Sequence, residues 1–204
     1  MKTRDKIIQE SLRLFNENSF ELTTTNSIAK ETDILEGSLW YHFNSKSDLL
    51  AVHADLFLDT FAKQRMHLED DNPRGLILGL ISIYQVLWDY RYIMRDTFEQ
   101  ISKDSPELHQ KLLDINTEID NWAKKTLIHA RNLEFLIIQD DDLDSVVEIT
   151  LIILRHWLDY SHKKYPSDSN LFLRKRGVNL IIKSLYPYLS DGSKDVMDTI
   201  YETY

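Results

Sequence analysis

Residues 23–50 read TTTNSIAKETDILEGSLWYHFNSKSDLL, and this stretch decides the fold. Its apolar residues fall into short groups at helical spacing, separated by polar breaks. The threonines at 23–25 are candidate N-caps for a short helix, and a second short helix follows over 35–43. An amphipathic helix over 4–18 precedes both. Three short helices, the last two joined by a tight turn, are typical of a helix-turn-helix.

The spacing inside this stretch supports that interpretation. Ala29 is small where two helices must cross closely, and Asp33 stands at the turn, where the backbone needs a residue that tolerates the left-handed conformation. Leu39, six residues further, is expected in the core. The positions left outward, at the helix end that enters a major groove, are Leu35, Glu36, Ser38, Trp40 and Tyr41. Core packing alone does not explain an exposed run of three large side chains at 40–42.

The N-terminal residues resemble the DNA-binding domain of the tetracycline-repressor (TetR) family. The resemblance covers roughly residues 3–52 and is densest over 37–50. It rests on ordered spacing and uncommon residue choices, namely Thr3-Arg4, Leu14-Phe15, Phe20-Glu21, Thr23-Thr24, Ile28-Ala29, the run from Gly37 to Phe43, Lys46 and Leu49-Leu50. It implies a ligand-responsive transcriptional repressor with a divergent helical C-terminal half, acting as a homodimer on a near-palindromic operator.

The resemblance also implies a set of contacts to double-stranded DNA. Thr24 or Thr25 would bind a phosphate, and Ser38 and Trp40 would face base edges. Three further residues would hold phosphates: Tyr41, His42 and Lys46. The start of the recognition helix completes the interface with Leu35, Glu36 and Gly37. Contacts of this kind fix the register on DNA, and only a few of them read sequence.

The charge of this region leaves two alternatives open. Residues 1–50 hold six Lys and Arg against eight Asp and Glu, a net charge of −2. Glu36 would either accept a hydrogen bond from a cytosine amino group or be repelled by phosphate. The second alternative supports another function, in which a regulator-like helical protein has lost sequence-specific DNA binding and acts as an interaction module.

Composition bounds the rest of the chain. The 204 residues are 43% hydrophobic and 28% charged, which is enough for a core, and 5 Gly and 4 Pro are too few for an all-β fold. Cysteine is absent, which excludes disulfides and thiolate zinc sites. The N-terminus has no signal-peptide pattern, and the most apolar region, 143–158, is too short and too charged to cross a membrane. A cytoplasmic protein is expected.

Nine helices are expected, without a convincing strand or repeat, so the fold class is all-α. Two domains are expected: a helix-turn-helix domain over 1–50 and a helical effector-binding and dimerisation domain over 51–204. Beyond 45, helices are expected at about 46–70, 73–90, 92–102, 105–131, 143–164 and 171–189. Asp191-Gly192 is interpreted as the end of the last one, and the final dozen residues as a short helix or a frayed end. The strand-like run 133–138 is interpreted as a loop or helix end.

The last two long helices are apolar nearly all round, although one stripe is enough to pack a helix on a core. A second apolar face suggests a partner, and the family resemblance implies a four-helix dimer interface. A central position in a large bundle is the alternative. The expected interface residues are Val147, Leu151, Leu154, Leu158, Val178, Ile181 and Leu185.

Residues 76–135 are rich in aromatic side chains, and the family usually encloses an effector pocket in this part of the chain. The composition favours a small hydrophobic or aromatic effector, while ordinary core packing is the alternative for each residue. The candidate ligand-binding residues are Tyr84, Trp88, Tyr92, Phe98, Trp122 and His129.

Catalysis has little support in the sequence. There is no nucleophile-elbow motif, phosphate loop or His-Glu-x-x-His motif. The acidic run at 140–144 lacks the glycine and the final glutamate of a calcium-binding EF-hand loop, so it is interpreted as a helix start. We therefore expect no enzyme activity, no cofactor and no metal site.

Overall fold

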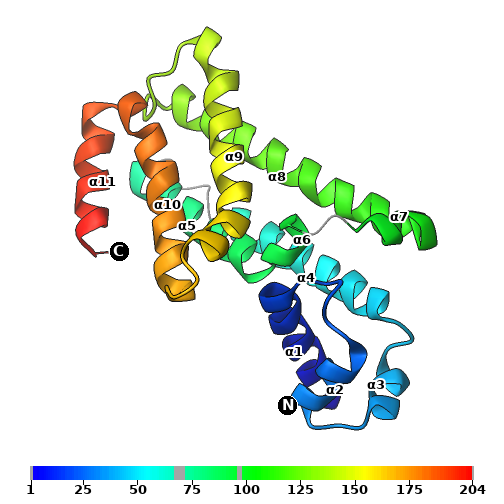
Figure 1. Ribbon diagram of the computed structural model, residues 1–204. Helices are drawn as coiled ribbons and strands as arrows, with labels where there is room; N and C mark the ends of the chain where they lie inside the picture. The colour runs from blue at the N-terminus through cyan, green and yellow to red at the C-terminus, as the bar shows by residue number, and fades with distance from the viewer. Residues whose placement is uncertain (1, 67–71, 96–97, 204) are drawn as a thin grey trace. The chain divides into compact units, whose positions relative to one another are not determined.

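The computed structural model describes residues 2–66, 72–95 and 98–203, and every regular element in them is helical (Figure 1). The α-helices are α1 (Thr3–Asn18), α2 (Thr25–Thr32), α3 (Glu36–His42), α4 (Lys46–Met66), α5 (Pro73–Asp89), α6 (Arg91–Arg95), α7 (Glu99–Asp104), α8 (Pro106–Asn132), α9 (Asp140–Lys164), α10 (Asn170–Leu185) and α11 (Asp191–Thr203), with a 3-10 turn at Tyr186–Tyr188. One antiparallel bridge joins Leu136 to Leu189. The all-α prediction is confirmed.

The chain forms two compact units. The first unit comprises residues 1–60 and 89–115, and the second comprises 61–88 and 116–204. Helices α4 and α8 each contribute residues to both. These units are defined by packing. The expected boundary near residue 50 instead separates a DNA-binding domain from an effector-binding and dimerisation domain, and it stays a prediction. Within the described residues, no helix has the length and apolar character needed to cross a bilayer.

Helices α1 to α3 form the helix-turn-helix that the sequence predicts. Thr24 is the N-cap of α2, and its hydroxyl accepts a hydrogen bond from the Ser27 N–H at 3.1 Å. Asp33 ends α2 in the left-handed conformation, with φ 59° and ψ 48°. Leu39 is completely buried and anchors α3 to the core. The turn chemistry and the core position of α3 are thus confirmed.

A buried aromatic cluster holds the first unit together. The Phe15 ring lies 5.1 Å from Phe20, 5.7 Å from His53 and 5.2 Å from Tyr92, measured between centroids. His53 Nδ1 lies 2.8 Å from the Tyr92 hydroxyl and its Nε2 lies 3.0 Å from the Ile8 carbonyl oxygen. The neutral ring therefore accepts from Tyr92 and donates to Ile8, which ties α4 to α6 and α1. Burial lowers the pKa of His53 to about 4.

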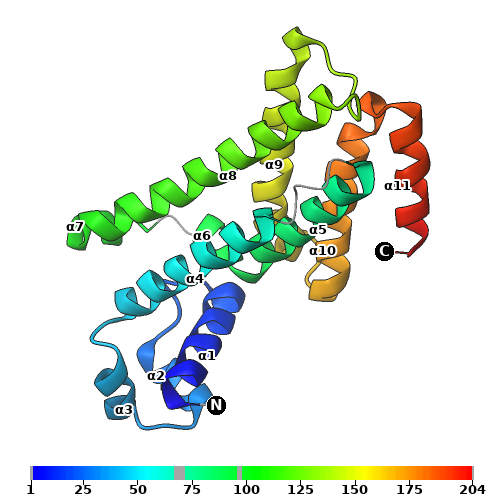
Figure 2. The same cartoon turned by 180° about the vertical axis from the view of Figure 1, so that it is seen from behind.

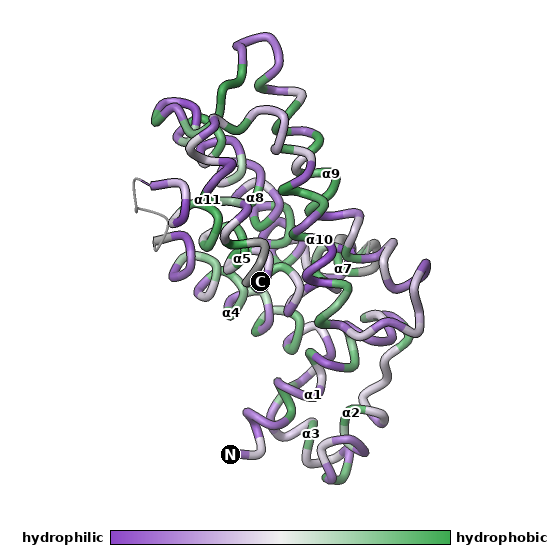
Figure 3. The backbone as a smooth tube through the Cα atoms, turned by 90° about the vertical axis from the view of Figure 1, so that its left-hand side faces the viewer, coloured by the Kyte–Doolittle hydropathy of each residue, from purple (hydrophilic) through white to green (hydrophobic). Residues whose placement is uncertain are grey.

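The second unit is built around the pair α9 and α10, which lie side by side in both views (Figures 1 and 2). The Trp157 indole N–H of α9 donates to the Leu173 carbonyl of α10 at 2.8 Å. Gly177 lets α10 approach closely, because a Cβ there would overlap the Tyr84 hydroxyl and lie 2.6 Å from Trp157 Cδ1. Hydrophobic and hydrophilic stretches alternate along the helices, α9 included (Figure 3).

Two element boundaries differ from expectation, and a third lies outside the described residues. The segment expected as one helix at 92–102 contains α6 and α7, and Phe98 before α7 adopts a left-handed backbone. Asp191-Gly192 begins α11 instead of ending α10, because Pro187 in the 3-10 turn has already interrupted that helix. The helix from Lys46 is described as far as Met66, and the end expected for it at Asp70 lies outside the described residues.

Candidate nucleic-acid interface and ligand cavity

The outer surface of α3 carries large side chains that the fold does not bury. Leu35 is 80% exposed, Tyr41 86% and Trp40 42%. Glu36 and Ser38 are also exposed. Such a set of exposed apolar and polar side chains on the second helix of a helix-turn-helix fits contact with the major groove. The structure thus brings the predicted outward residues onto one exposed helix.

Gly37 leaves open space in the middle of this surface. Its φ is not positive, and a Cβ built on it has no neighbour within 4 Å. The fold therefore does not require glycine here, although glycine within a helix costs about 1 kcal/mol relative to alanine.

Glu36 has a partner that the sequence did not reveal. The Thr25 hydroxyl donates to Glu36 Oε1 at 2.6 Å and thereby joins the start of α2 to the start of α3. Neither of the two roles expected for Glu36, reading a base or repelling a phosphate, involves a bond within the protein. The bond to Thr25 makes the carboxylate a group that positions α3.

Lys46 is likewise engaged inside the first unit. Its ammonium donates to the carbonyls of Phe20 at 2.7 Å, Glu21 at 3.3 Å and Thr23 at 3.1 Å, and it lies 4.4 Å from the centroid of the Phe20 ring. Burial lowers its pKa, and the Glu21 charge opposes that effect. Because an ammonium has three N–H donors, a phosphate contact would have to replace one of these bonds.

Two cations of α1 are also engaged. Arg13 forms ion pairs with three carboxylates: Glu10 at 2.9 Å, Glu17 at 2.8 Å and Glu31 at 2.6 Å. Lys6 donates to the Thr32 carbonyl at 2.7 Å, at the end of α2. Lys2 and Lys30 form no ion pair with the described residues. Of the six Lys and Arg side chains in residues 1–50, Lys6, Arg13 and Lys46 are thus held by protein groups, and Lys2, Arg4 and Lys30 remain as the cations without an ion pair to the described residues.

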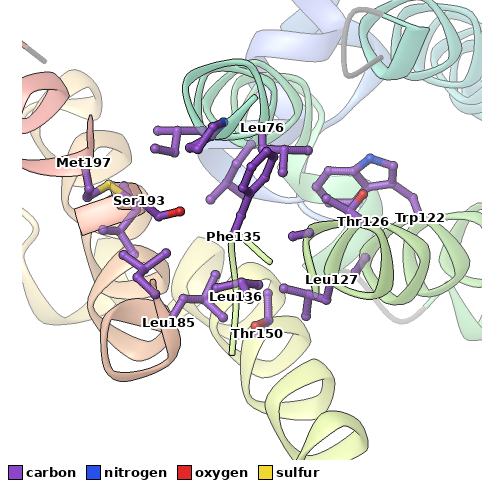
Figure 4. A pocket seen from close by; sticks show the side chains of 17 residues that line it. Leu76, Trp122, Thr126, Leu127, Phe135, Leu136, Thr150, Leu185, Ser193 and Met197 are labelled. Atoms are coloured by element: carbon purple, nitrogen blue, oxygen red, sulfur yellow. The ribbon is translucent and has the colours of Figure 1, made fainter. Parts of the chain in front are cut away.

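The second unit contains a small apolar cavity of about 80 Å³ (Figure 4). Side chains from α5, α8, α9, α10 and α11 and from the loop at 135–136 surround it. The few hydroxyls in its wall include Thr150, which donates to the Val146 carbonyl at 2.8 Å, and Ser193, which lies 3.0 Å from the Ser190 hydroxyl. Since no charged residue lines the cavity, it suits an uncharged, apolar guest.

Only one of the six candidate ligand residues, Trp122, lines this cavity. Tyr92 and Phe98 are buried in the first unit, where their rings lie 6.2 Å apart. Tyr84 and Trp88 pack against each other at 6.4 Å in the second unit, and His129 on α8 is half-buried outside the wall. The other five residues lie outside this cavity, so their part in ligand binding stays a prediction.

The candidate dimer residues lie mostly inside the second unit. Five are buried: Val147, Leu154, Leu158, Val178 and Ile181. Leu151 and Leu185 are half-buried, and Leu185 lines the cavity. The apolar residues that α9 exposes are instead Ile149, Ile152 and Tyr160, which are 47%, 56% and 50% exposed. Ile152 and Tyr160 line a groove of about 430 Å³ that also includes His156 and, on α10, Leu180. This surface is therefore the apolar side of α9 that one copy leaves exposed, and the interface at the seven expected residues stays a prediction.

Two family models together cover nearly all of the chain. The one described as bacterial regulatory proteins, tetR family, matches residues 7–52, and the one described as bacterial transcriptional repressor matches residues 53–197. The chain belongs to the TetR family. It is a DNA-binding transcriptional regulator, as the exposed surface of α3 suggested.

Curated relatives of this TetR-family regulator include two biofilm-operon negative regulators named IcaR. The protein from Staphylococcus epidermidis is 24% identical over 160 residues, covering 76% of this chain and 81% of that one. The protein from Staphylococcus aureus is 44% identical over 95 residues, which span only 47% of this chain and 49% of that one.

Solved structures share the fold of this TetR-family regulator. A TetR-family regulator from Marinobacter aquaeolei has a TM-score of 0.80 at 24% identity, and the match covers 99% of this chain and 98% of that one. The ketosteroid regulator KstR2 of Mycobacterium tuberculosis has a TM-score of 0.65 at 21% identity, and the match covers 93% of this chain and 96% of that one.

Among the described residues, no group of three His, Asp or Glu side chains converges on a point where they could hold a metal ion.

Proposed function

We propose that this TetR-family regulator is a homodimeric repressor that binds a near-palindromic operator in the cytoplasm and responds to an uncharged, apolar small molecule. The exposed surface of α3, with Gly37 open in its middle, carries the proposal for DNA. The negative regulators among its relatives support repression in preference to activation. Its role is thus regulatory and not catalytic.

The dimer follows from the exposed apolar stripe on α9. Ile149, Ile152, His156 and Tyr160 are spaced three or four residues apart and therefore share one helix face. A second copy that covers this stripe and the adjoining groove buries apolar surface now exposed to water. A two-fold dimer presents two copies of α3 to half-sites separated by about one helical turn of DNA or a multiple of it.

The apolar cavity of the second unit is the proposed effector site. A ligand with a charge or an unmatched hydrogen-bonding group would lose its hydration without gaining a partner, so the wall selects neutral, apolar molecules. Drug-sized ligands occupy roughly 300–1,000 Å³, so an effector of that size must widen the cavity. Met197 is an adaptable side chain in its wall.

Selection of bound duplexes from a random library tests the DNA-binding proposal. The purified protein should enrich a near-palindrome at low and at moderate salt. The Gly37→Ala variant should fold as well as the parent but lose enrichment, because its added methyl group occupies the open space. Gly192→Ala, also at an open position, is the matched control and should enrich the same sequence.

A failed selection favours the second candidate function. If no duplex is enriched at either salt concentration, a helical interaction module without sequence-specific DNA binding becomes the better description. The specific observation behind it is the engagement of Lys6, Arg13 and Lys46 within the first unit, which removes three of the six cations of residues 1–50 from contact with phosphates.

A matched series of small aromatic compounds tests the effector proposal. Toluene should raise the thermal unfolding temperature, whereas benzoate and benzylamine, which carry a charge at neutral pH, should not. Ala130 lines the cavity, and Ala130→Leu should remove the response to toluene by filling the space. Equal responses to all three compounds would contradict an apolar site.

A further inference from the structure

We propose that Leu35 reads a thymine methyl group in the operator, while Glu36 beside it positions α3 and does not read a base. The inference rests on the proposed function and adds one specific base contact to it. It starts from the observation that Leu35 has no evident role in the folded protein.

Leu35 occupies the N-cap of α3, where leucine is a poor choice. Its backbone is extended, with φ −72° and ψ 146°, and its side chain makes no capping hydrogen bond. Serine, threonine, aspartate or asparagine at an N-cap typically stabilises a helix by about 1 kcal/mol relative to residues that cannot cap. Leu35 thus forgoes this stabilisation.

Burial does not compensate for the missing cap. The Leu35 side chain is 80% exposed, whereas the core contact of α3 is made by Leu39, which is completely buried. Isolated exposed leucines are common, but this one stands at the helix end that enters the major groove in a helix-turn-helix. The side chain is therefore available to a partner at the place where bases are read.

The neighbours of Leu35 narrow what it can read. The Thr25 hydroxyl donates to Glu36 Oε1, so the carboxylate next to Leu35 in the chain is held toward α2. Gly37 has no side chain to keep the helix away from the DNA. In the major groove, thymine is the base that presents a methyl group, and apolar side chains recognise it by contact. The geometry points to thymine in preference to cytosine opposite Leu35.

Replacing thymine by uracil in the selected operator tests this contact. The exchange removes only the methyl group and keeps the base pair, so each thymine of a half-site is replaced in turn, symmetrically in both halves. At one position, the replacement should lower the affinity of the protein for the operator by about fourfold per half-site. This corresponds to about 0.8 kcal/mol for one buried methyl-sized group. Leu35→Ala should bind the thymine and uracil duplexes equally.

Two control variants keep the test specific. Leu22 is 78% exposed in the turn between α1 and α2, and Leu22→Ala should keep the full uracil effect. Leu35→Val retains an apolar side chain and should keep part of the affinity loss caused by uracil. Thermal unfolding should show that each variant folds.

The outcomes separate the two proposals. An operator without a uracil-sensitive position, or one whose sensitivity persists in Leu35→Ala, overturns the role of Leu35 and leaves the repressor function standing. If the parent protein enriches no operator at all, both the function and this contact are overturned.

Discussion

Three backbone carbonyls surround the Lys46 ammonium, although the family resemblance implied a phosphate contact. The carbonyls belong to Phe20, Glu21 and Thr23, in the turn that leads into α2. Lys46 therefore ties the start of α4 to the start of α2, and through Thr25 and Glu36 the same linkage continues to α3. These bonds give Lys46 a role in positioning α2 and α3, the helices of the candidate DNA interface.

The variant Lys46→Met separates the structural role from a phosphate contact. It keeps the aliphatic stem and removes the ammonium, so we expect unfolding free energy to fall by about 1–3 kcal/mol as carbonyls lose a partner. The salt dependence of operator binding should keep its slope, because no phosphate contact is removed. Lys30→Met, at an exposed cation of α2, is the control for stability. If the slope of log affinity against log salt concentration became shallower by about one for each half-site, Lys46 would be shown to contact a phosphate.

His53 predicts a pH dependence of stability. Its pKa is about 4 in the folded chain, because burial disfavours the charged ring, and roughly 6.5 in an unfolded chain. Between these values the unfolded chain binds a proton that the folded chain does not. Unfolding free energy should therefore fall as pH drops from about 6.5 to 4, by up to about 3 kcal/mol. Urea unfolding from pH 7.5 to 4.5 measures this, and His53→Gln should show a smaller loss; equal losses would exclude His53 as the cause.

Single residues mark the limit of prediction from sequence in this chain. Asp33 and Leu39 were predictable because their roles depend on local turn chemistry and on spacing within one helix. The bond from Thr25 to Glu36 spans eleven residues and those of Lys46 span about 25, so no local pattern contains them. The charge of these side chains was readable from the sequence, but their partners were not.

Caps and prolines located some helix ends but not all of them, since Pro187 interrupts α10 before the expected end at 189. Pro106 begins α8 and Thr24 caps α2, as expected. The error at α11 arose because Asp191-Gly192 is compatible with a helix end as well as with a helix start. Similarly, aromatic residues in 76–135 indicated a pocket, whereas most of them pack within a core. Composition alone does not distinguish a wall of a cavity from a filled interior.

The close packing of α10 makes a prediction at the scale of elements. In Gly177→Ala the new methyl group would overlap Tyr84 and Trp157, so the helices must move apart. We expect a loss of about 1–3 kcal/mol in unfolding free energy. Gly192→Ala adds the same methyl group in open space within α11 and should be neutral or slightly stabilising. Chemical denaturation of both variants measures the difference, and equal stabilities would contradict close packing at Gly177.

The assembly depends on which apolar residues remain at the surface after each copy has folded. The sequence showed that α9 and α10 are apolar on more than one face but not which face the core uses. The core takes Leu154 and Leu158, and the opposite side of α9 keeps Ile152 and Tyr160 exposed. A dimer interface is therefore expected at the side that the core leaves exposed, where a second copy removes apolar surface from water.

Ile152→Glu tests that interface in the whole molecule. The site is 56% exposed, so the isolated chain should tolerate the carboxylate, but in a dimer the charge would be buried without a partner. We expect the parent protein to sediment as a dimer and Ile152→Glu as a folded monomer, with at least a tenfold loss of operator affinity because the two copies of α3 no longer bind as one unit. Ile137→Glu is the matched control, since Ile137 is 62% exposed and lies outside the α9 stripe, and it should remain dimeric. If Ile152→Glu stays dimeric while Ile137→Glu dissociates, the interface lies near the loop at 133–139 instead.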